Sequence, residues 1–397
     1  MTDVPGEALG RLRALAMADD ALARRLHARA DVRDFAALAV SEAAARGIAV
    51  AAERLAAAAA PDPLGIAAFA ATPASGTAWP GADWLPVQVV DVGGRVFVDW
   101  LYFGERPLRE PFFEDSVRRA LRAPFNRAFR YRLALADFVA GAAAAQSLKP
   151  SGLIFHMSRC GSTLAAQMLA ARADTIVVSE AAPIDAMVQA GRSWPQLPAA
   201  RHAALLAAMI AAYGRPRRGG ERHYVLKLDS WHALALPLFR QAVPSVPWVF
   251  MYRCPLEVLV SQMRQRGTQM VPQIVHPSLY GIDAADVIPD QDYCARVLRV
   301  ICAAAADHYG AGGLLMNYRD LPASIVSALL PHFGIACDDD TRALMLRAAG
   351  QNAKSPSLQF EDDSAAKQAE ATPALRAAAE RHLAAVYARL EALRAGP

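Results

Sequence analysis

Residues 151–170 read SGLIFHMSRCGSTLAAQMLA, and this stretch decides the fold of the second half of the chain. The apolar run at 153–155 predicts a buried strand, and the helix formers with apolar residues at helical spacing from 162 onward predict a helix. The tight loop between them brings backbone N–H groups, two hydroxyls and an arginine to one helix N-terminus. Because the first N–H groups of a helix have no partners and the helix dipole is positive there, the stretch predicts an anion site, with a phosphate as the expected occupant.

This loop differs from the loop of nucleoside triphosphatases, which reads G-x-x-x-x-G-K-[ST] and uses its lysine to reach the β- and γ-phosphates. Here Ser162 and Thr163 follow Gly161 directly, so no lysine occupies that place. A cation stands two residues before the glycine instead, as Arg159. The loop keeps a phosphate cradle and lacks the lysine that serves a γ-phosphate.

A second passage from strand to helix lies at residues 246–261, VPWVFMYRCPLEVLVS. The apolar and aromatic run at 248–252 predicts a buried strand, which Arg253 ends. Ser261 stands eight positions later, on the helix expected after Pro255. A bidentate guanidinium and a hydroxyl are suited to hold another phosphate, and an enzyme that uses ATP has no need of this second anion site.

Residues 159–163, Arg-Cys-Gly-Ser-Thr, resemble the phosphosulfate-binding loop of the sulfotransferases that use 3′-phosphoadenosine 5′-phosphosulfate (PAPS), which reads roughly [KR]-S-G-[ST]-[ST]. Cys160 replaces the usual serine, and Arg253 and Ser261 have the spacing of the family's 3′-phosphate element. The resemblance covers about residues 150–360. It implies PAPS as co-substrate, PAP as its product, no metal, and an acceptor substrate with a hydroxyl group on a peptide, sugar, lipid or small alcohol.

The resemblance also assigns catalytic roles at two other predicted strand ends. Lys227 ends YVLK, where the family often has a lysine that neutralises charge on the bridging oxygen of the leaving group. Glu180 follows TIVVS, where some branches have a glutamate that acts as general base on the acceptor hydroxyl. Asp229 and His232 follow Lys227 and stay alternative bases, since the small-molecule branch has its catalytic histidine just after this lysine. Arg159 is expected to stabilise charge on the transferred group.

Two positions nearer the C-terminus complete the expected nucleotide site. Tyr318 matches the family's late strand, which usually ends Tyr-Glu-Asp-Leu, although Arg319 replaces the glutamate. Lys354 is assigned to the loop that closes over the nucleotide.

Strands and helices alternate from residue 149 onward, with strands expected at 152–157, 175–179, 223–228, 247–252 and 313–317. This alternation predicts an α/β domain over 149–397, a parallel sheet flanked by helices like that of P-loop proteins. The carboxyl ends of parallel strands meet at one edge of the sheet, where ligands bind. Since Arg159, Glu180, Lys227 and Arg253 each follow a strand, we expect them to converge at that edge.

Residues 1–148 predict a separate, mostly helical N-terminal domain with one β-hairpin. The stretch VQVVDVGGRVFVDW predicts the hairpin, with Gly93 and Gly94 at its turn. Helices are expected over residues 1–60 and 111–145.

Composition limits the class of protein. The chain has 397 residues, of which 54% are hydrophobic and 20% charged, with a net charge of +4, which favours a globular protein and disfavours a nucleic-acid binder. Five scattered cysteines without metal spacing, no apolar leader and no membrane span favour a soluble cytoplasmic protein, and an oligomer is possible.

Two other functions fit parts of the pattern. A P-loop kinase or other nucleotide-binding protein would use ATP-Mg, and a non-catalytic module would only bind the nucleotide. A cysteine-dependent phosphatase is a weaker alternative: Cys160 stands at a helix start beside Arg159, where the pKa of a thiol is expected to fall. That class needs an arginine six residues after the cysteine, and Ala166 stands there.

Overall fold

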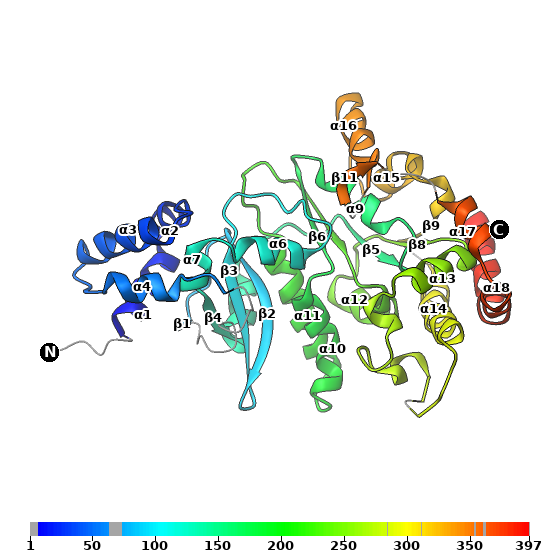
Figure 1. Cartoon of the computed structure of the whole chain (residues 1–397), viewed down its shortest axis with the longest axis horizontal. Helices are drawn as coiled ribbons and strands as arrows, with labels where there is room; N and C mark the ends of the chain where they lie inside the picture. Colours follow the sequence, from blue (N-terminus) through cyan, green and yellow to red (C-terminus); the bar gives the residue numbers. More distant parts are fainter. Residues whose placement is uncertain are drawn as a thin grey trace. The chain divides into compact units, whose positions relative to one another are not determined.

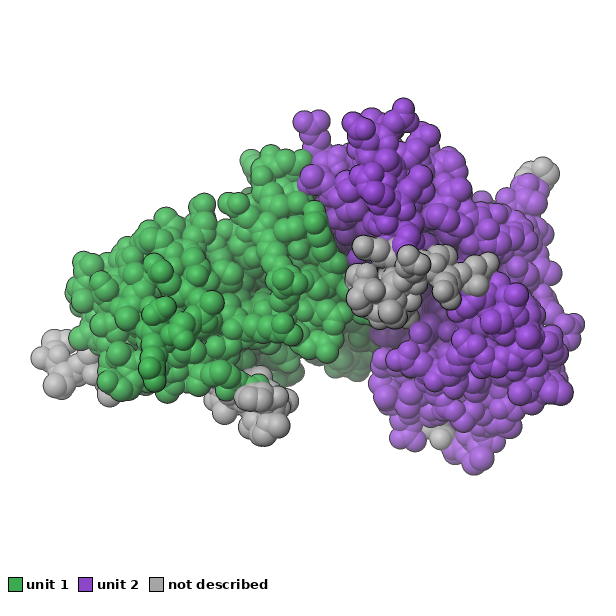
Figure 2. Space-filling model, turned by 45° about the horizontal axis from the view of Figure 1, so that its top comes forward, with its two compact units in different colours: residues 1–148, 181–197, 204–221 green, residues 149–180, 198–203, 222–397 purple. Residues whose placement is uncertain are grey.

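The computed structural model describes residues 7–62, 74–283, 285–310, 312–352, 355–359 and 363–396, and the chain divides into two compact units. Unit 1 contains residues 1–148, 181–197 and 204–221, and unit 2 contains 149–180, 198–203 and 222–397 (Figure 2). Two segments that follow the start of unit 2 in the sequence therefore belong to the unit of the N-terminal residues. A single domain boundary near residue 148 stays a prediction.

Unit 2 is built on a five-stranded parallel sheet with the strand order β6-β7-β5-β8-β9 (Figure 1). Its strands are β5 (Gly152–His156), β6 (Thr175–Ser179), β7 (His223–Lys227), β8 (Trp248–Tyr252) and β9 (Gly313–Asn317). Each lies within about one residue of its predicted place. The predicted fold class, a parallel sheet flanked by helices, is confirmed.

The middle residues of these strands are mostly apolar because helices cover both faces of the sheet. Every residue of β5, β6 and β8 is buried. α9 (Ser162–Ala170) packs on β6 and on α16 (Asp339–Ala349), while α13 (Pro255–Arg264), α14 (Asp290–Asp307) and α18 (Pro373–Ala395) pack on one another (Figure 1). The smaller elements of the unit are η1 (Ser230–Ala235), α12 (Leu236–Ala242), η2 (Thr268–Met270), η3 (Pro277–Tyr280), η4 (Tyr318–Asp320), η5 (Ile325–Leu329), α15 (Leu330–His332), β10 (Gln351–Asn352), β11 (Ser355–Gln359) and α17 (Ser364–Glu370).

The strand order places the loop after β5 at the centre of one edge. From β5 the chain runs to β6 and β7 on one side, and then to β8 and β9 on the other. In a parallel sheet, the point where the connections diverge in this way is where a ligand crevice forms. The loop over residues 157–161 lies at this point.

Unit 1 contains a four-stranded sheet in the order β1-β4-β3-β2 and a group of helices. The strands are β1 (Ala74–Gly76), β2 (Trp84–Val92), β3 (Arg95–Tyr102) and β4 (Tyr131–Ala134). The helices are α1 (Glu7–Ala18), α2 (Asp20–His27), α3 (Val32–Ala44), α4 (Ala52–Ala58), α6 (Phe113–Ala120), α7 (Pro124–Ala128), α8 (Leu135–Ala144), α10 (Ala182–Ser193) and α11, of which residues 204–213 belong to this unit (α11 spans Ala199–Tyr213). The predicted hairpin is confirmed as β2 and β3, and both glycines of its turn have positive φ.

The prediction of helix throughout 111–145 is wrong at Tyr131–Ala134, which forms β4. Tyr131 and Leu133 are buried, so the residues alternate as in a strand with one covered face. Arg132 donates to both carboxylate oxygens of Asp99 on β3, at 2.6 and 2.8 Å. Pairing with β3 therefore decides the conformation of a segment too short for its own pattern to be read.

Arg215 binds the segment 204–221 to the rest of unit 1. Its buried guanidinium donates to the carbonyl oxygens of Pro80 (2.6 Å) and Trp84 (2.5 Å). It also lies 5.1 and 5.3 Å from the ring centres of Trp79 and Trp100. Burial is the main cause that lowers the pKa of Arg215 to about 10, so the group stays charged at neutral pH.

No helix in the described parts of the chain combines the length and the apolar character that a membrane span requires.

Arg215→Met tests this attachment. The substitution leaves two buried carbonyl oxygens without donors, each at a cost of about 1–3 kcal/mol, so we expect the free energy of unfolding to fall by about 3 kcal/mol. Urea unfolding followed by tryptophan fluorescence measures the change. Arg201→Met, which removes an exposed arginine from α11, the helix that ends shortly before Arg215, is the control and is expected to change stability by less than about 0.5 kcal/mol. Equal midpoints for the two variants would contradict the assignment.

Candidate active site

The loop after β5 has the backbone shape of a phosphate cradle. Ser158, Arg159 and Gly161 all have positive φ values, 78°, 52° and 84°. Gly161 is the N-cap of α9, and a Cβ there would come within 2.4 Å of Leu321 and 2.9 Å of Tyr318. Only glycine fits this position. The first N–H groups of α9 have no partner within the helix and lie next to this loop. Left-handed backbone at non-glycine residues is held by its surroundings and collects at functional sites.

α13 and the residues after it hold the loop in this shape. Gln262 is fully buried, donates to the hydroxyl of Ser158 at 3.1 Å and accepts the N–H of Gly267 at 2.8 Å. Arg159 donates to the carbonyl oxygen of Gln265 at 2.6 Å. The guanidinium of Arg159 is thus engaged at the end of α13. Sequence reasoning missed Gln262, because its partners lie far away in the chain and a polar residue in a helix gives no sign of burial.

The expectation that the pKa of the Cys160 thiol falls is wrong. The side chain is fully buried and its Sγ donates to the carbonyl oxygen of Met251 on β8, at 3.0 Å. Burial raises the pKa of the thiol to about 11. Burial outweighs the lowering effect of the backbone hydrogen bonds and of the charges of Lys227 and Arg253, so the thiol stays protonated and packs under the loop.

Lys227, Glu180 and His156 meet at the ends of three neighbouring strands. Lys227 ends β7 with a wholly buried side chain, and its ammonium forms an ion pair with the carboxylate of Glu180, just after β6. The N–H of Glu180 also donates to the carbonyl oxygen of Lys227 at 2.7 Å. His156 ends β5, and its Nε2 lies 3.4 Å from Glu180 Oε1. The structure thus joins two predicted catalytic residues and adds His156, which sequence reasoning had assigned no role.

The protonation states within this cluster follow from its contacts. His156 Nδ1 accepts the N–H of Ser158 at 3.1 Å, so Nε2 carries the proton and donates to the carbonyl oxygen of Leu228 at 2.8 Å. Burial lowers the pKa of His156, which keeps the ring neutral. Burial alone would raise the pKa of Glu180, but the charge of Lys227 and the contact with His156 hold it well below its usual value. Glu180 is therefore ionised, and in this state it is a weak base.

Arg253 forms the other half of the site, after β8. Its buried side chain donates to Glu257 at 2.6 Å, and Nη2 donates to Asp363 at 2.9 Å and Ser364 at 3.0 Å. Its guanidinium lies 3.9 Å from the ring centre of Tyr318, which follows β9. Burial alone would lower the pKa of Arg253, but the two carboxylates raise it. Arg253 and Tyr318, which the resemblance assigns to the nucleotide site, thus lie against each other. Sequence analysis assigned no role to Glu257, Asp363 and Ser364, and the last two lie more than 100 residues from Arg253 in the sequence.

The remaining predicted residues fall into three groups. Ser162 and Thr163 are buried in the first turn of α9, and Ser261 lies one helical turn after Glu257 on α13, two turns from Arg253. Asp229 and His232 form a capping box at the start of η1, so both have a local structural role. Lys354 lies outside the described residues.

The chain is similar to several solved sulfotransferase structures. The sulfotransferase domain from the curacin biosynthetic pathway has 14% sequence identity and a TM-score of 0.37, with 59% of this chain and 98% of that chain covered. A sulfotransferase from Alicyclobacillus acidocaldarius has 15% identity and a TM-score of 0.36, with 62% and 96% covered. One from Mycobacterium tuberculosis has 18% identity and a TM-score of 0.31, with 54% and 77% covered. No protein-family profile and no curated protein sequence matches the chain.

The depressed pKa of Glu180 predicts a particular pH dependence of stability. A carboxyl group whose pKa is lower in the folded than in the unfolded chain stabilises the fold above its unfolded pKa, about 4.3, and loses this contribution as the pH falls below that value. We therefore expect the stability difference between the wild type and Glu180→Gln to be largest near pH 6 and to shrink towards pH 3. Urea unfolding across this range measures it.

The control is Glu53→Gln, which removes an exposed carboxylate from α4. Its stability difference from the wild type is expected to stay small at each pH. A difference for Glu180→Gln that is constant from pH 6 to pH 3 would show that the Glu180 carboxyl titrates alike in the folded and unfolded chain.

Proposed function

We propose that the protein is a PAPS-dependent sulfotransferase that moves a sulfuryl group from PAPS to an acceptor hydroxyl. The observation that carries the proposal is the arrangement at the carboxyl edge of the sheet in unit 2. The loop after β5 forms a cradle at a helix N-terminus, with Lys227 on the β7 side and Arg253 on the β8 side. Two anion-binding places flanking one strand suit a donor that carries two separate anionic groups.

Arg253 would hold the 3′-phosphate. The carboxylate of Asp363 and the hydroxyl of Ser364 stand in for phosphate oxygens, since they accept from Nη2 at hydrogen-bonding distance. Lys367, which is buried and pairs with Asp363 at 2.8 Å, would bring a second cation to the same place. The ring of Tyr318 on the guanidinium fixes its plane, and Ser261 is the hydroxyl on the following helix.

Lys227 and Glu180 would carry the chemistry. The acceptor oxygen attacks the sulfur, its proton passes to Glu180, and the bond from sulfur to the bridging oxygen breaks with its electron pair left on PAP. The ammonium of Lys227 stabilises that leaving oxygen, as positioned charges do in a buried site. Arg159 would supply a second positive charge to the transferred group, once its guanidinium releases the carbonyl oxygen of Gln265.

The ion pair suggests how Glu180 becomes a base. While Lys227 is bound to it, the pKa of Glu180 is too low for efficient proton removal. When Lys227 turns to the bridging oxygen of the donor, Glu180 loses its nearest positive charge, and burial then raises its pKa. Binding of the donor would in this way activate the base.

Metal-independent binding of PAP is the first test. We expect PAP to bind at micromolar level in the presence of EDTA, and Arg253→Ala to weaken it about tenfold or more, because a charge-assisted contact is lost. Isothermal titration calorimetry measures both. Arg264→Ala is the control, since Arg264 is an exposed arginine at the end of α13, the helix that follows Arg253, and pairs with Glu370. Tighter binding of ATP-Mg than of PAP would favour a kinase instead.

Asp363→Asn tests the same phosphate site, but here PAP affinity is expected to rise instead of fall. Asp363 competes for the guanidinium that would bind the phosphate, so neutralising it is expected to raise PAP affinity roughly threefold or more. A loss of affinity would mean that Asp363 builds the site rather than occupying it.

Turnover tests the assignment of the base. We expect Glu180→Gln and Lys227→Met each to lower kcat about 10²-fold or more, with PAP affinity changed little by Glu180→Gln. Turnover is measured as PAP released from PAPS with a panel of phenolic, sugar and alcohol acceptors. Asp229→Asn is the comparison at the alternative base. Full activity of Glu180→Gln together with loss in Asp229→Asn or His232→Ala would reassign the role.

A further inference from the structure

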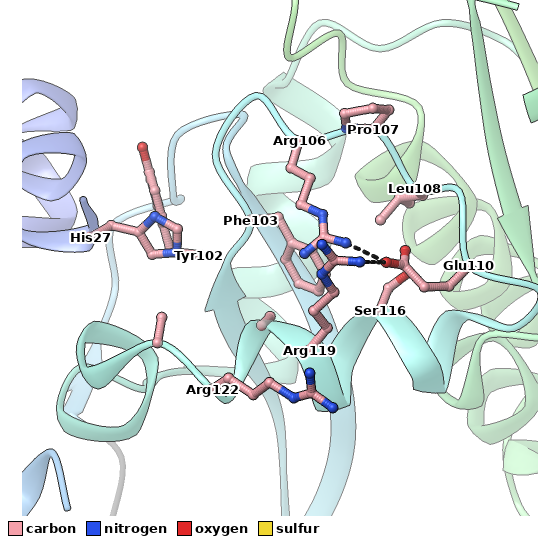
Figure 3. Close-up of a pocket in the computed structure, with 12 residues that line it drawn as sticks. His27, Tyr102, Phe103, Arg106, Pro107, Leu108, Glu110, Ser116, Arg119 and Arg122 are labelled. Carbon is pink, nitrogen blue, oxygen red and sulfur yellow. Dashed lines mark hydrogen bonds and ion pairs between the residues drawn. The ribbon is translucent and has the colours of Figure 1, made fainter. Parts of the chain in front are cut away.

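Unit 1 contains a cavity that the proposed reaction does not use. It has a volume of about 470 Å³ and lies among α2, the segment that follows β3, and α6 with the residues after it (Figure 3). This size falls in the range of about 300–1,000 Å³ that is usual for small-molecule sites. All of its lining residues belong to unit 1.

One side of the cavity carries excess positive charge. Arg106 forms an ion pair with Glu110, and Arg119 donates to the same carboxylate oxygen at 3.4 Å. Ser116 donates to the other oxygen of Glu110 at 2.7 Å. Arg122 adds a third guanidinium, and its side chain has no hydrogen bond or ion pair with any described residue. Three arginines and one glutamate line this side, so positive charges exceed negative ones by two among the lining residues.

The carboxylate of Glu110 orients Arg106 and Arg119. Figure 3 shows the guanidinium groups of Arg106 and Arg119 turned toward Glu110 and close to each other. Burial and the neighbouring charge of Arg119 lower the pKa of Arg106. The two guanidinium groups therefore repel each other, and their shared contact with Glu110 keeps them close. A second anion beside Glu110 would relieve this repulsion, and guanidinium groups bind carboxylate, sulfate and phosphate in a bidentate manner.

The other side is aromatic and rigid. Tyr102 contacts the ring of His27 edge-on at 4.9 Å, and its hydroxyl donates to Asp83 at 3.1 Å. Phe103 stacks on Phe113 with 5.8 Å between the ring centres. Burial lowers the pKa of His27, so its ring adds no charge at neutral pH. These rings are fixed by contacts outside the cavity, so a flat apolar group can bind without ordering them first.

We propose that this cavity binds a small organic anion in which a carboxylate, sulfate or phosphate is joined to an aromatic body. The anionic group contacts Arg106 and Arg119, and the aromatic body lies against Phe103 and Tyr102. Neither part of the cavity fits a cation or a purely aliphatic alcohol as well, because the charge is positive and the apolar wall is made of rings.

Naphthalene-2-sulfonate is the probe, measured by isothermal titration calorimetry at low salt. We expect one saturable site per chain, and binding at least about tenfold weaker for the neutral naphthalene-2-sulfonamide, since it lacks the charge-assisted contact. Inorganic sulfate is the second comparison and is expected to bind more weakly still. Sulfate that binds as tightly as the naphthalene compound would overturn the aromatic half of the proposal.

Neighbouring arginines provide the matched control. Arg119→Gln is expected to weaken the probe about tenfold, whereas Arg118→Gln removes the same charge one residue away and is expected to change affinity less than twofold. Arg118 pairs with Asp115 and does not line the cavity. Equal losses in the two variants would show only a long-range charge effect and overturn the site.

Two further variants locate the binding. Glu110→Gln is expected to raise affinity, because it removes the internal competitor and keeps an oxygen that can accept from the arginines. Arg253→Ala, in unit 2, is expected to leave affinity for the probe unchanged. A loss in Arg253→Ala would place the probe at the proposed nucleotide site, and the absence of saturation up to millimolar probe would overturn the cavity as a binding site.

Discussion

The buried ion pair between Lys227 and Glu180 joins the ends of two parallel strands and fixes the charge of the proposed reaction centre. The side chain of Lys227 is wholly buried, so removing Glu180 would leave a buried charge without its partner, which is strongly destabilising. The two residue types therefore depend on each other for stability as well as for chemistry. His156 extends the cluster to the central strand, so three strand ends share one electrostatic arrangement.

The sequence predicts the sheet of unit 2 well because both of its faces are covered. Strands buried on both faces are continuous apolar runs, and Lys227, Glu180 and Arg253 are the polar residues at the ends of such runs. The resemblance to the sulfotransferases assigned the roles of Lys227 and Glu180. What could not be predicted are contacts between distant segments. Gln262 donates to Ser158, which lies 104 residues away in the sequence, and Asp363 accepts from Arg253, which lies 110 residues away. No local sequence pattern predicts either contact.

Strand β4 shows the same limit at the level of secondary structure. Its four residues follow and precede helices, and their own propensity gives no reason to interrupt a helical stretch. The decisive interaction is the pairing of Arg132 with Asp99, which appears only once β3 lies alongside. The pKa of Cys160 was mispredicted for a related reason: a neighbouring arginine and a helix start favour a low thiol pKa, but the thiol points to the carbonyl oxygen of Met251 on β8 and burial raises its pKa.

The discontinuity of unit 1 has a consequence for the order of folding during synthesis. The hydroxyl of Tyr213 donates to the carbonyl oxygen of Pro86, and Arg217 donates to that of Gly104, so the N-terminal sheet lacks these donors until the ribosome has passed residue 217. Strands β5 and β6 of unit 2 emerge before that point. The N-terminal unit therefore cannot be completed before part of the second one has been synthesised, and no cut at a single peptide bond yields both units whole.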